Sequence, residues 1–168
     1  MGETVYLGIG SNLFDRDTNI SKAIDLIKNM EAFSFTRMAS IYETPPLYNT
    51  IQPDFLNTVI EGNYDAEPHE LLAEIQSAEA MMGRPADRQK NQPRVIDVDI
   101  LIFGERIIEN TSLEIPHPKL AERRFVLEPL AEISPDFPVP KFDRTPVELL
   151  AECSDKSSIQ RISVSQVA

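Results

Sequence analysis

The sequence predicts an α+β fold with a ferredoxin-like βαββαβ core, followed by helical and strand additions toward the C-terminus. Segments with strand alternation or helical spacing follow one another in the order strand, helix, strand, strand, helix, strand. Hydrophobic residues make up 42% and charged residues 26% of the 168-residue chain, which is ordinary for a globular domain. No repeat, low-complexity tract or long linker divides the chain, so we expect one domain over 1–168.

The first half of the core follows from periodicity and turn chemistry. A strand over 5–9 is followed by residues 10–12 (GSN), whose composition is typical of a turn. Apolar residues recur at helical spacing over 17–30, and this predicts the first helix. Alternation then predicts strands over 33–42 and 55–64.

The second half of the core begins at Pro68, which suits the first turn of a helix that we expect to end at Gly83. A strongly apolar strand is predicted over 95–103. The additions are expected as a short segment over 105–115, helical pieces around 118–130 and 146–152, and a last strand over 158–164.

Two segments, 44–54 and 84–93, match neither a helix nor a strand. The first contains three prolines and little periodicity, and the second is polar and charged with no apolar face. Such loops beside one core are either lids over a ligand or ordinary connections, and the sequence leaves both open.

The formal net charge of −11 disfavours a general nucleic-acid binder, which needs a basic face to neutralise phosphates. A small anionic ligand needs only local arginines or a metal ion, and the basic residues do gather locally. The two clusters are Arg84, Arg88, Lys90 and Arg94, and then Lys119, Arg123 and Arg124.

The location of the chain is expected to be cytoplasmic. Cys153 is the only cysteine, so an internal disulfide is impossible and a reducing compartment suits the chain. The N-terminus shows no secretory signal, and no apolar run approaches the roughly 20 residues that span a bilayer. We therefore expect no membrane partner.

Asp97 and Asp99 are the clearest candidate catalytic residues. In a strand they project from the same face, about 7 Å apart, and paired carboxylates on an apolar strand need a partner. A hard cation such as Mg²⁺ would serve, shared with substrate phosphates. The alternative is a half-exposed strand with a polar face.

Arg94 precedes this pair by three residues, and its planar guanidinium suits phosphate oxygens. Arginine with two aspartates is a reasonable set for phosphoryl transfer, which depends mainly on positioning and charge neutralisation. An internal salt bridge between Arg94 and an aspartate, with no ligand, is the competing interpretation. His117 lies between two prolines that fix its backbone, and Arg123 follows it closely enough to reach the same anion. Gly8 and Gly10 are a weak dinucleotide signal, because position 13 is not glycine and no Walker motif is present.

Together these residues resemble a known family, the hydroxymethyl-dihydropterin pyrophosphokinases. The signature-like segment is KNQPRVIDVDIL at 90–101, and it departs from the family pattern at Asn91 and Gln92, as the preceding loop does at Ala86. Three other segments agree with the family in the same order, from Leu7 to about Phe137: LGIGSNL, then SIYETPPL with QPDFLNTV, then LEIPHPKLAERRFVLEPLAEISPDF.

The resemblance implies transfer of pyrophosphate from ATP to 6-hydroxymethyl-7,8-dihydropterin in folate biosynthesis, giving AMP and the pterin diphosphate. It implies two Mg²⁺ ions held by Asp97 and Asp99, and catalytic roles for both aspartates with Arg94 and Arg84. The pterin-binding residues that it implies are Thr44, Pro46, Leu47, Phe55, Asn57 and Phe125. The nucleotide-binding residues that it implies are Gln76, Glu79, Arg84, Arg88, Lys90, Arg94, His117 and Arg123.

Stacking between Phe55 and Phe125 suits a flat heterocycle, and the Asn57 amide can match its polar edge. Taken alone, these three residues would be read as core and strand residues. We expect the chain to act as a monomer on its two small substrates. Two rivals remain open: another metal-dependent phosphotransferase or phosphohydrolase, and a ligand-sensing module that consumes no ATP.

Overall fold

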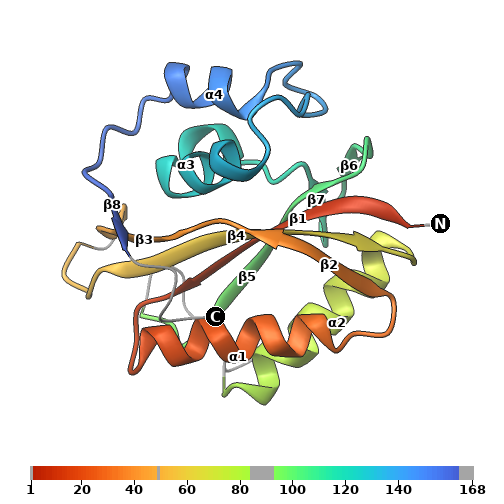
Figure 1. Ribbon diagram of the computed structural model, residues 1–168, viewed down its shortest axis with the longest axis horizontal. Coiled ribbons are helices and arrows are strands. Elements are labelled where there is room, and N and C mark those ends of the chain that lie inside the picture. The colour runs from red at the N-terminus through yellow and green to blue at the C-terminus, as the bar shows by residue number, and fades with distance from the viewer. Residues whose placement is uncertain (1, 49, 84–92, 163–168) are drawn as a thin grey trace.

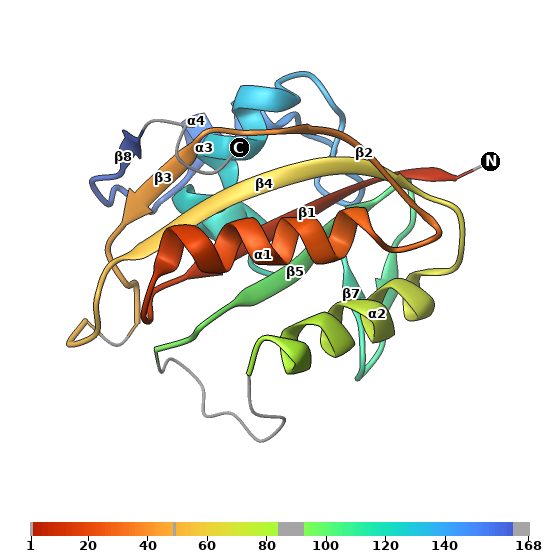
Figure 2. The same cartoon turned by 60° about the horizontal axis from the view of Figure 1, so that its bottom comes forward.

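A six-stranded antiparallel sheet organises the chain, with helices on both of its faces (Figures 1 and 2). The computed structural model describes residues 2–48, 50–83 and 93–162. The elements are β1 (Glu3–Ser11), α1 (Arg16–Lys28), β2 (Phe33–Met38), β3 (Ile41–Thr44), β4 (Phe55–Tyr64), α2 (Pro68–Met81), β5 (Asp97–Phe103), β6 (Ile108–Glu109), β7 (Glu114–Ile115), the 3₁₀ turn η1 (Leu120–Glu122), α3 (Arg124–Ile133), α4 (Pro146–Glu152) and β8 (Gln160–Ile162).

The strand order is β5-β1-β4-β3-β8, and β2 also pairs with β4. The predicted ferredoxin-like arrangement is confirmed, with β1, β4 and β5 in its core positions. The continuous strand predicted over 33–42 is wrong in detail, because it is divided into β2 and β3. The division falls at Ala39 and Ser40, where the Ser40 amide donates to the Glu132 carboxylate instead of to a neighbouring strand.

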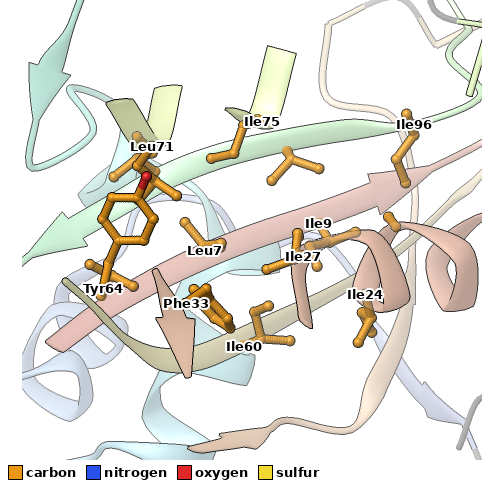
Figure 3. Close-up of a cluster of buried hydrophobic side chains, with 14 of the residues drawn as sticks. Leu7, Ile9, Ile24, Ile27, Phe33, Ile60, Tyr64, Leu71, Ile75 and Ile96 are labelled. Atoms are coloured by element: carbon orange, nitrogen blue, oxygen red, sulfur yellow. The ribbon is translucent and has the colours of Figure 1, made fainter. Parts of the chain in front are cut away.

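The helices α1 and α2 bury one face of the sheet (Figure 3). Ile24 and Ile27 of α1 pack with Leu7 and Ile9 of β1 in a cluster that is at most 4% exposed at these positions. Burying such a side chain contributes about 1.5–3 kcal/mol each. The start of α1 is capped by Asp15, whose side chain accepts a hydrogen bond from the Thr18 amide.

The opposite face is covered only in part, by α3, α4 and the turn before them (Figure 1). Tyr6 and Leu101 of the sheet pack there with Leu127 and Leu130 of α3. The next positions of β1 on this face, Gly8 and Gly10, line an open pocket instead. Partial coverage therefore leaves room for a ligand at one end of this face.

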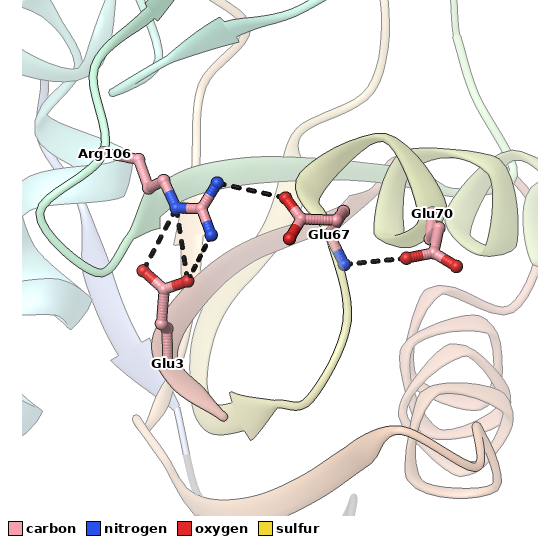
Figure 4. Close-up of polar contacts among 4 residues, drawn as sticks. All are labelled: Glu3, Glu67, Glu70 and Arg106. Atoms are coloured by element: carbon pink, nitrogen blue, oxygen red, sulfur yellow. Dashed lines mark hydrogen bonds and ion pairs between the residues drawn. The ribbon is translucent and has the colours of Figure 1, made fainter. Parts of the chain in front are cut away.

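An ion-pair cluster fastens the other end of β1 (Figure 4). Arg106 donates to both carboxylate oxygens of Glu3, at 2.7 Å for its shortest contact, and to Glu67 at 3.1 Å. Glu67 begins α2, and its amide donates to Glu70 in a capping box. The cluster joins β1, the turn after β5 and the first turn of α2.

Several predicted boundaries differ from the structure. The turn expected at residues 10–12 is strand as far as Ser11, because Gly10 pairs with both Asn57 and Asp97. The segment over 105–115 forms the β6–β7 hairpin. The last strand begins two residues later than predicted. Among the residues described, no helix has the length and apolar character needed to cross a membrane.

Candidate active site

A pocket of about 750 Å³, partly open to solvent, lies on the sheet face that α3 leaves uncovered. Strands β1, β4 and β5 form its floor, and the segment after β3 and the start of α3 form its walls. Its lining residues are Gly8, Ile9, Gly10, Thr44, Pro45, Leu47, Tyr48, Gln52, Phe55, Asn57, Thr58, Arg94, Asp97, Asp99, Leu101, Arg123, Phe125 and Val126.

The floor of the pocket is open because two successive positions of β1 that face it, Gly8 and Gly10, have no side chain. A Cβ atom at Gly10 would lie 2.5 Å from Oδ1 of Asn57, so only glycine fits there without displacing the amide. Gly8 is less constrained, since a Cβ there would meet Leu101 at 3.4 Å. Sequence reasoning treated this pair only as a weak dinucleotide signal. The signal that sequence reasoning missed was two glycines two residues apart in one strand, next to a strand that carries an asparagine.

One wall pairs an amide with aromatic rings. Asn57 donates through Nδ2 to Oγ1 of Thr44 at 2.7 Å, and both residues are buried. This bond fixes the amide orientation and leaves the carbonyl oxygen of Asn57 as the acceptor. Phe55, Phe125 and Leu47 line the same pocket, so the structure brings together five of the six predicted pterin-binding residues.

The predicted acid pair lies at the start of β5. Asp97 is opposite Gly10 and Asp99 is opposite Gly8, so both carboxylates line the pocket above the glycine floor. Arg94 donates through Nη1 to Oδ2 of Asp97 at 3.0 Å, which is the internal salt bridge of the competing interpretation. That ion pair and a ligand are compatible, because the arginine keeps further donors.

The two arginines that line the pocket each have a donor atom without a hydrogen-bond partner among the described residues. The Nε atoms of Arg94 and Arg123 are buried and lack a hydrogen-bond partner among the described residues. Buried donors without a partner are rare in folded proteins, and each calls for an explanation such as strain, a catalytic role, or a bound water or ion. The Arg123 guanidinium also lies 5.5 Å from the Phe125 ring centroid and 5.8 Å from that of Tyr48. The site therefore offers unsatisfied cationic donors beside its acid pair.

His117 follows the cis Ile115–Pro116 peptide and is predominantly neutral. Burial, with the nearby Arg123 charge, lowers the pKa of His117 from its usual 6.5 to about 4. Its Nδ1 accepts a hydrogen bond from the Lys119 amide at 3.1 Å. The ring therefore carries its proton on Nε2 and can donate there to an anion without being charged.

Asn12 was missed by sequence reasoning, although it lies in the GSN segment. Its amide donates to the Arg94 carbonyl, and its side-chain oxygen accepts from the Arg94 amide at 2.7 Å. Its Nδ2 donates to Gln52 and to the carbonyl of Pro53. One buried side chain thus joins the end of β1, the segment before β4 and the approach to β5.

His117 is not among the residues that line this pocket, and the remaining predicted residues also fall outside the lining. Glu79 is buried on α2, where its carboxylate accepts from the Val98 amide at 2.9 Å, and Gln76 is exposed on the same helix. Pro46 is buried and is not among the lining residues, whereas the neighbouring Pro45 is. Three predicted residues, Arg84, Arg88 and Lys90, lie outside the described part of the chain, as do Ala86, Asn91 and Gln92.

Comparison with known proteins shows the family of the chain. The profile of the 7,8-dihydro-6-hydroxymethylpterin-pyrophosphokinase family matches residues 6–135. The 2-amino-4-hydroxy-6-hydroxymethyldihydropteridine pyrophosphokinase of Bacillus subtilis is 41% identical over 133 residues, 79% of each chain. The protein of the same description from Pseudomonas aeruginosa is 35% identical over 153 residues, covering 91% of this chain and 93% of that one.

Longer proteins also match. A folate synthesis bifunctional protein of Arabidopsis thaliana is 40% identical over 78% of this chain, which spans 27% of that protein. A crystal structure of Plasmodium falciparum HPPK-DHPS has a TM-score of 0.75 at 14% identity and covers 90% of this chain and 45% of its own, which supports the fold alone. The profile match and the two pyrophosphokinase relatives place this chain in the 7,8-dihydro-6-hydroxymethylpterin-pyrophosphokinase family, whose reaction is the ATP-dependent transfer of pyrophosphate to a hydroxymethyldihydropterin in folate biosynthesis.

Proposed function

We propose that the pocket above Gly8 and Gly10 is the active site in which this chain transfers pyrophosphate from ATP to 6-hydroxymethyl-7,8-dihydropterin. The observation that supports this most directly is the meeting of two kinds of surface in one cavity. A flat slot of glycine floor and aromatic wall adjoins an acid pair with unsatisfied arginine donors. A planar, uncharged substrate suits the first surface, and a polyphosphate suits the second.

The pterin is proposed to lie between Phe55 and Phe125, over the glycine floor. Thr44 fixes the Asn57 amide, so that the Asn57 carbonyl oxygen is available to an N–H of the heterocycle. Leu47 would close the slot on its apolar side, and Pro46, next to it in the chain, is proposed to support it. Offset-stacked or edge-to-face aromatic pairs contribute about 0.5–1.5 kcal/mol beyond the area that they bury.

Asp97 and Asp99 are proposed to hold two Mg²⁺ ions. Both carboxylates face the pocket, and hard oxygen ligands are those that Mg²⁺ takes while keeping positions for phosphate oxygens. Across the described residues, no cluster of three or more histidine, cysteine or acidic side chains adds a further ligand. When bound, Mg²⁺ neutralises charge on the phosphates and acidifies the substrate hydroxyl.

The chain's own residues orient the reacting groups. Arg94 and Arg123 would bind phosphate oxygens through the donors that have no partner among the described residues. The neutral His117 would donate through Nε2 to the nucleotide. The substrate hydroxyl then attacks the β-phosphorus in line, AMP leaves, and Asp97 is the proposed acceptor of the hydroxyl proton.

Other assignments rest on the resemblance to the family. Gln76 and Glu79 on α2 are proposed for the adenosine side, beyond the outer edge of β5. Arg84, Arg88 and Lys90 are proposed to contact phosphates, with Arg84 also catalytic. A cytoplasmic monomer with no nucleic-acid or membrane partner remains our expectation.

The product mixture tests the proposal. The protein is incubated with ATP, Mg²⁺ and 6-hydroxymethyl-7,8-dihydropterin, and AMP, ADP and the pterin diphosphate are quantified. AMP formed one-for-one with pterin diphosphate, and only with both substrates present, is the expected result. ADP would indicate an ordinary kinase, free phosphate a hydrolase, and pterin binding without ATP consumption a sensing module.

A further inference from the structure

We infer that Glu132, on α3 and outside the pocket, is a positioning residue that sets the pterin slot by holding β3 against α3. This inference rests on the proposed pterin site. Glu132 lies seven residues after Phe125, about 10 Å along the helix at 1.5 Å per residue. It therefore acts through the two elements that it joins and not by contact with a substrate.

The carboxylate of Glu132 collects donors from the junction of β2 and β3. The Ser40 amide lies 3.1 Å from both carboxylate oxygens, and the Ser40 hydroxyl donates to Oε2 at 2.9 Å. The Tyr42 hydroxyl donates to Oε1 at 2.7 Å. Arg161 of β8 adds an ion pair at 3.6 Å. The Glu132 side chain is only 26% exposed, so these bonds are partly shielded from water.

The junction needs this acceptor because the strand is interrupted there. Ser40 is 1% exposed, and its amide lies between β2 and β3, where it takes no part in strand pairing. Without Glu132, a buried backbone donor and two hydroxyl groups would lose their acceptor. The pKa of Tyr42 is raised, by burial and by its bond to the Glu132 carboxylate.

The two walls of the slot belong to the two elements that Glu132 joins, β3 and α3. β3 ends at Thr44, which fixes Asn57 and precedes the lining residue Leu47. α3 begins at Arg124, and Phe125 in its first turn forms the facing wall. The first turn of α3 is held separately, since the Arg124 amide donates to Asp155. Loss of the Glu132 contact should therefore move β3 and leave the nucleotide side in place.

The matched control lies one turn earlier on the same helix. Glu128 is 25% exposed in its side chain and pairs with Arg124 at 3.5 Å; its charge contributes to the raised pKa of Tyr42, but among the described residues it forms no hydrogen bond with β3. Glu132→Gln and Glu128→Gln remove the same charge from the same helix. They differ in whether the β2–β3 junction loses an acceptor.

The test measures the pterin dissociation constant by direct titration, and the KM for each substrate, in the full chain. For Glu132→Gln we expect weaker pterin binding by roughly tenfold and an ATP KM changed by less than about twofold. Glu128→Gln should change neither. Tyr42→Phe should weaken pterin binding by a smaller factor and add little when combined with Glu132→Gln.

A Glu132→Gln protein that binds pterin like Glu128→Gln would overturn the inference, as would equal losses for both substrates. If Glu132→Gln fails to fold, Tyr42→Phe and Ser40→Ala can replace it, because each removes one contact to Glu132. The same comparison then applies: weaker pterin binding with an unchanged ATP KM supports the inference. Wild-type protein that binds no pterin would instead refute the proposed pterin site. Wild-type binding with unaffected variants refutes only the role of Glu132.

Discussion

Arginine is used in opposite ways at the two ends of β1. Beside Glu3, all three nitrogen positions of the Arg106 guanidinium donate to carboxylates (Figure 4). At the pocket end, Arg94 and Arg123 each keep a buried Nε that has no hydrogen-bond partner among the described residues. A saturated arginine joins elements, whereas an unsaturated one keeps binding capacity for a ligand. We therefore expect charge to join elements at one end of the strand and to bind a ligand at the other.

The acid pair provides the most severe test of the pocket end. Asp97→Asn and Asp99→Asn keep the size of each side chain but remove its charge, and with it the proposed metal ligand. We expect kcat to fall by about 10³-fold or more in each variant, since charge neutralisation carries most of phosphoryl-transfer catalysis. Steady-state AMP formation measures this. Either variant retaining near-full turnover would refute the metal assignment.

Arg123→Gln tests whether the Arg123 guanidinium binds the nucleotide. We expect kcat/KM for ATP to fall about 10–100-fold, while the melting temperature stays within roughly 2 °C of the wild type. Little stability should be lost because the Nε bonds to no described residue, and the contacts of the guanidinium with the Phe125 and Tyr48 rings contribute only about 0.5–1 kcal/mol each at exposed sites. A large fall in melting temperature with unchanged kinetics would show that Arg123 has a structural role and does not bind the nucleotide.

Gly10→Ala tests the open floor of the pocket. The added Cβ would lie 2.5 Å from Oδ1 of Asn57 and should displace the amide, raising the pterin KM by about tenfold. Gly8→Ala is the matched control on the same face of β1, because its Cβ meets Leu101 at an ordinary 3.4 Å. Equal effects of the two substitutions would show that lost volume, and not the displaced amide, limits pterin binding.

His117 links the pocket end to pH-dependent stability. Its pKa is lowered to about 4 in the folded chain, against about 6.5 when unfolded. Below pH 6.5 the unfolded chain therefore binds the extra proton, so stability should fall as the pH drops from about 6.5 to 4, by roughly 2 kcal/mol. Denaturant unfolding across this range measures the slope, and His117→Gln should flatten it. Parallel slopes for the two proteins would contradict the assignment.

Arg106→Gln is expected to have the smallest effect and completes the comparison. Exposed ion pairs contribute little, so the melting temperature should fall by only about 1–3 °C, with both KM values unchanged. Differential scanning fluorimetry and the AMP assay measure the two quantities. A kinetic defect here would show that the ends of β1 are coupled.

The sequence predicted much of this molecule where local pattern decides the outcome. β4 was expected over 55–64 and occupies Phe55–Tyr64, because alternation and flanking turn residues agree. α4 likewise matches its expected range, with a capping box at Thr145. The acid pair was found because two aspartates in an apolar strand share one face.

Other features depend on long-range contacts that no local pattern shows. The break between β2 and β3 arises from Glu132, some 90 residues away in the chain. Asn12 reads as a turn residue, yet its bonds reach Gln52 and Arg94. Phe125 reads as an ordinary core residue from the sequence. It lines the pocket only because α3 covers the sheet face incompletely.

The contact between Glu79 and Val98 has a consequence for solubility. β5 and β8 end the main strand order of the sheet, β2 forms a further edge beside β4, and exposed strand edges recruit other chains into aggregates. The Glu79 carboxylate occupies an outward-facing amide of β5, and β8 covers the edge of β3 with a strand of only three residues. The edges of β5 and β3 are thereby poorer templates for further strands, which limits edge-to-edge association at these two places.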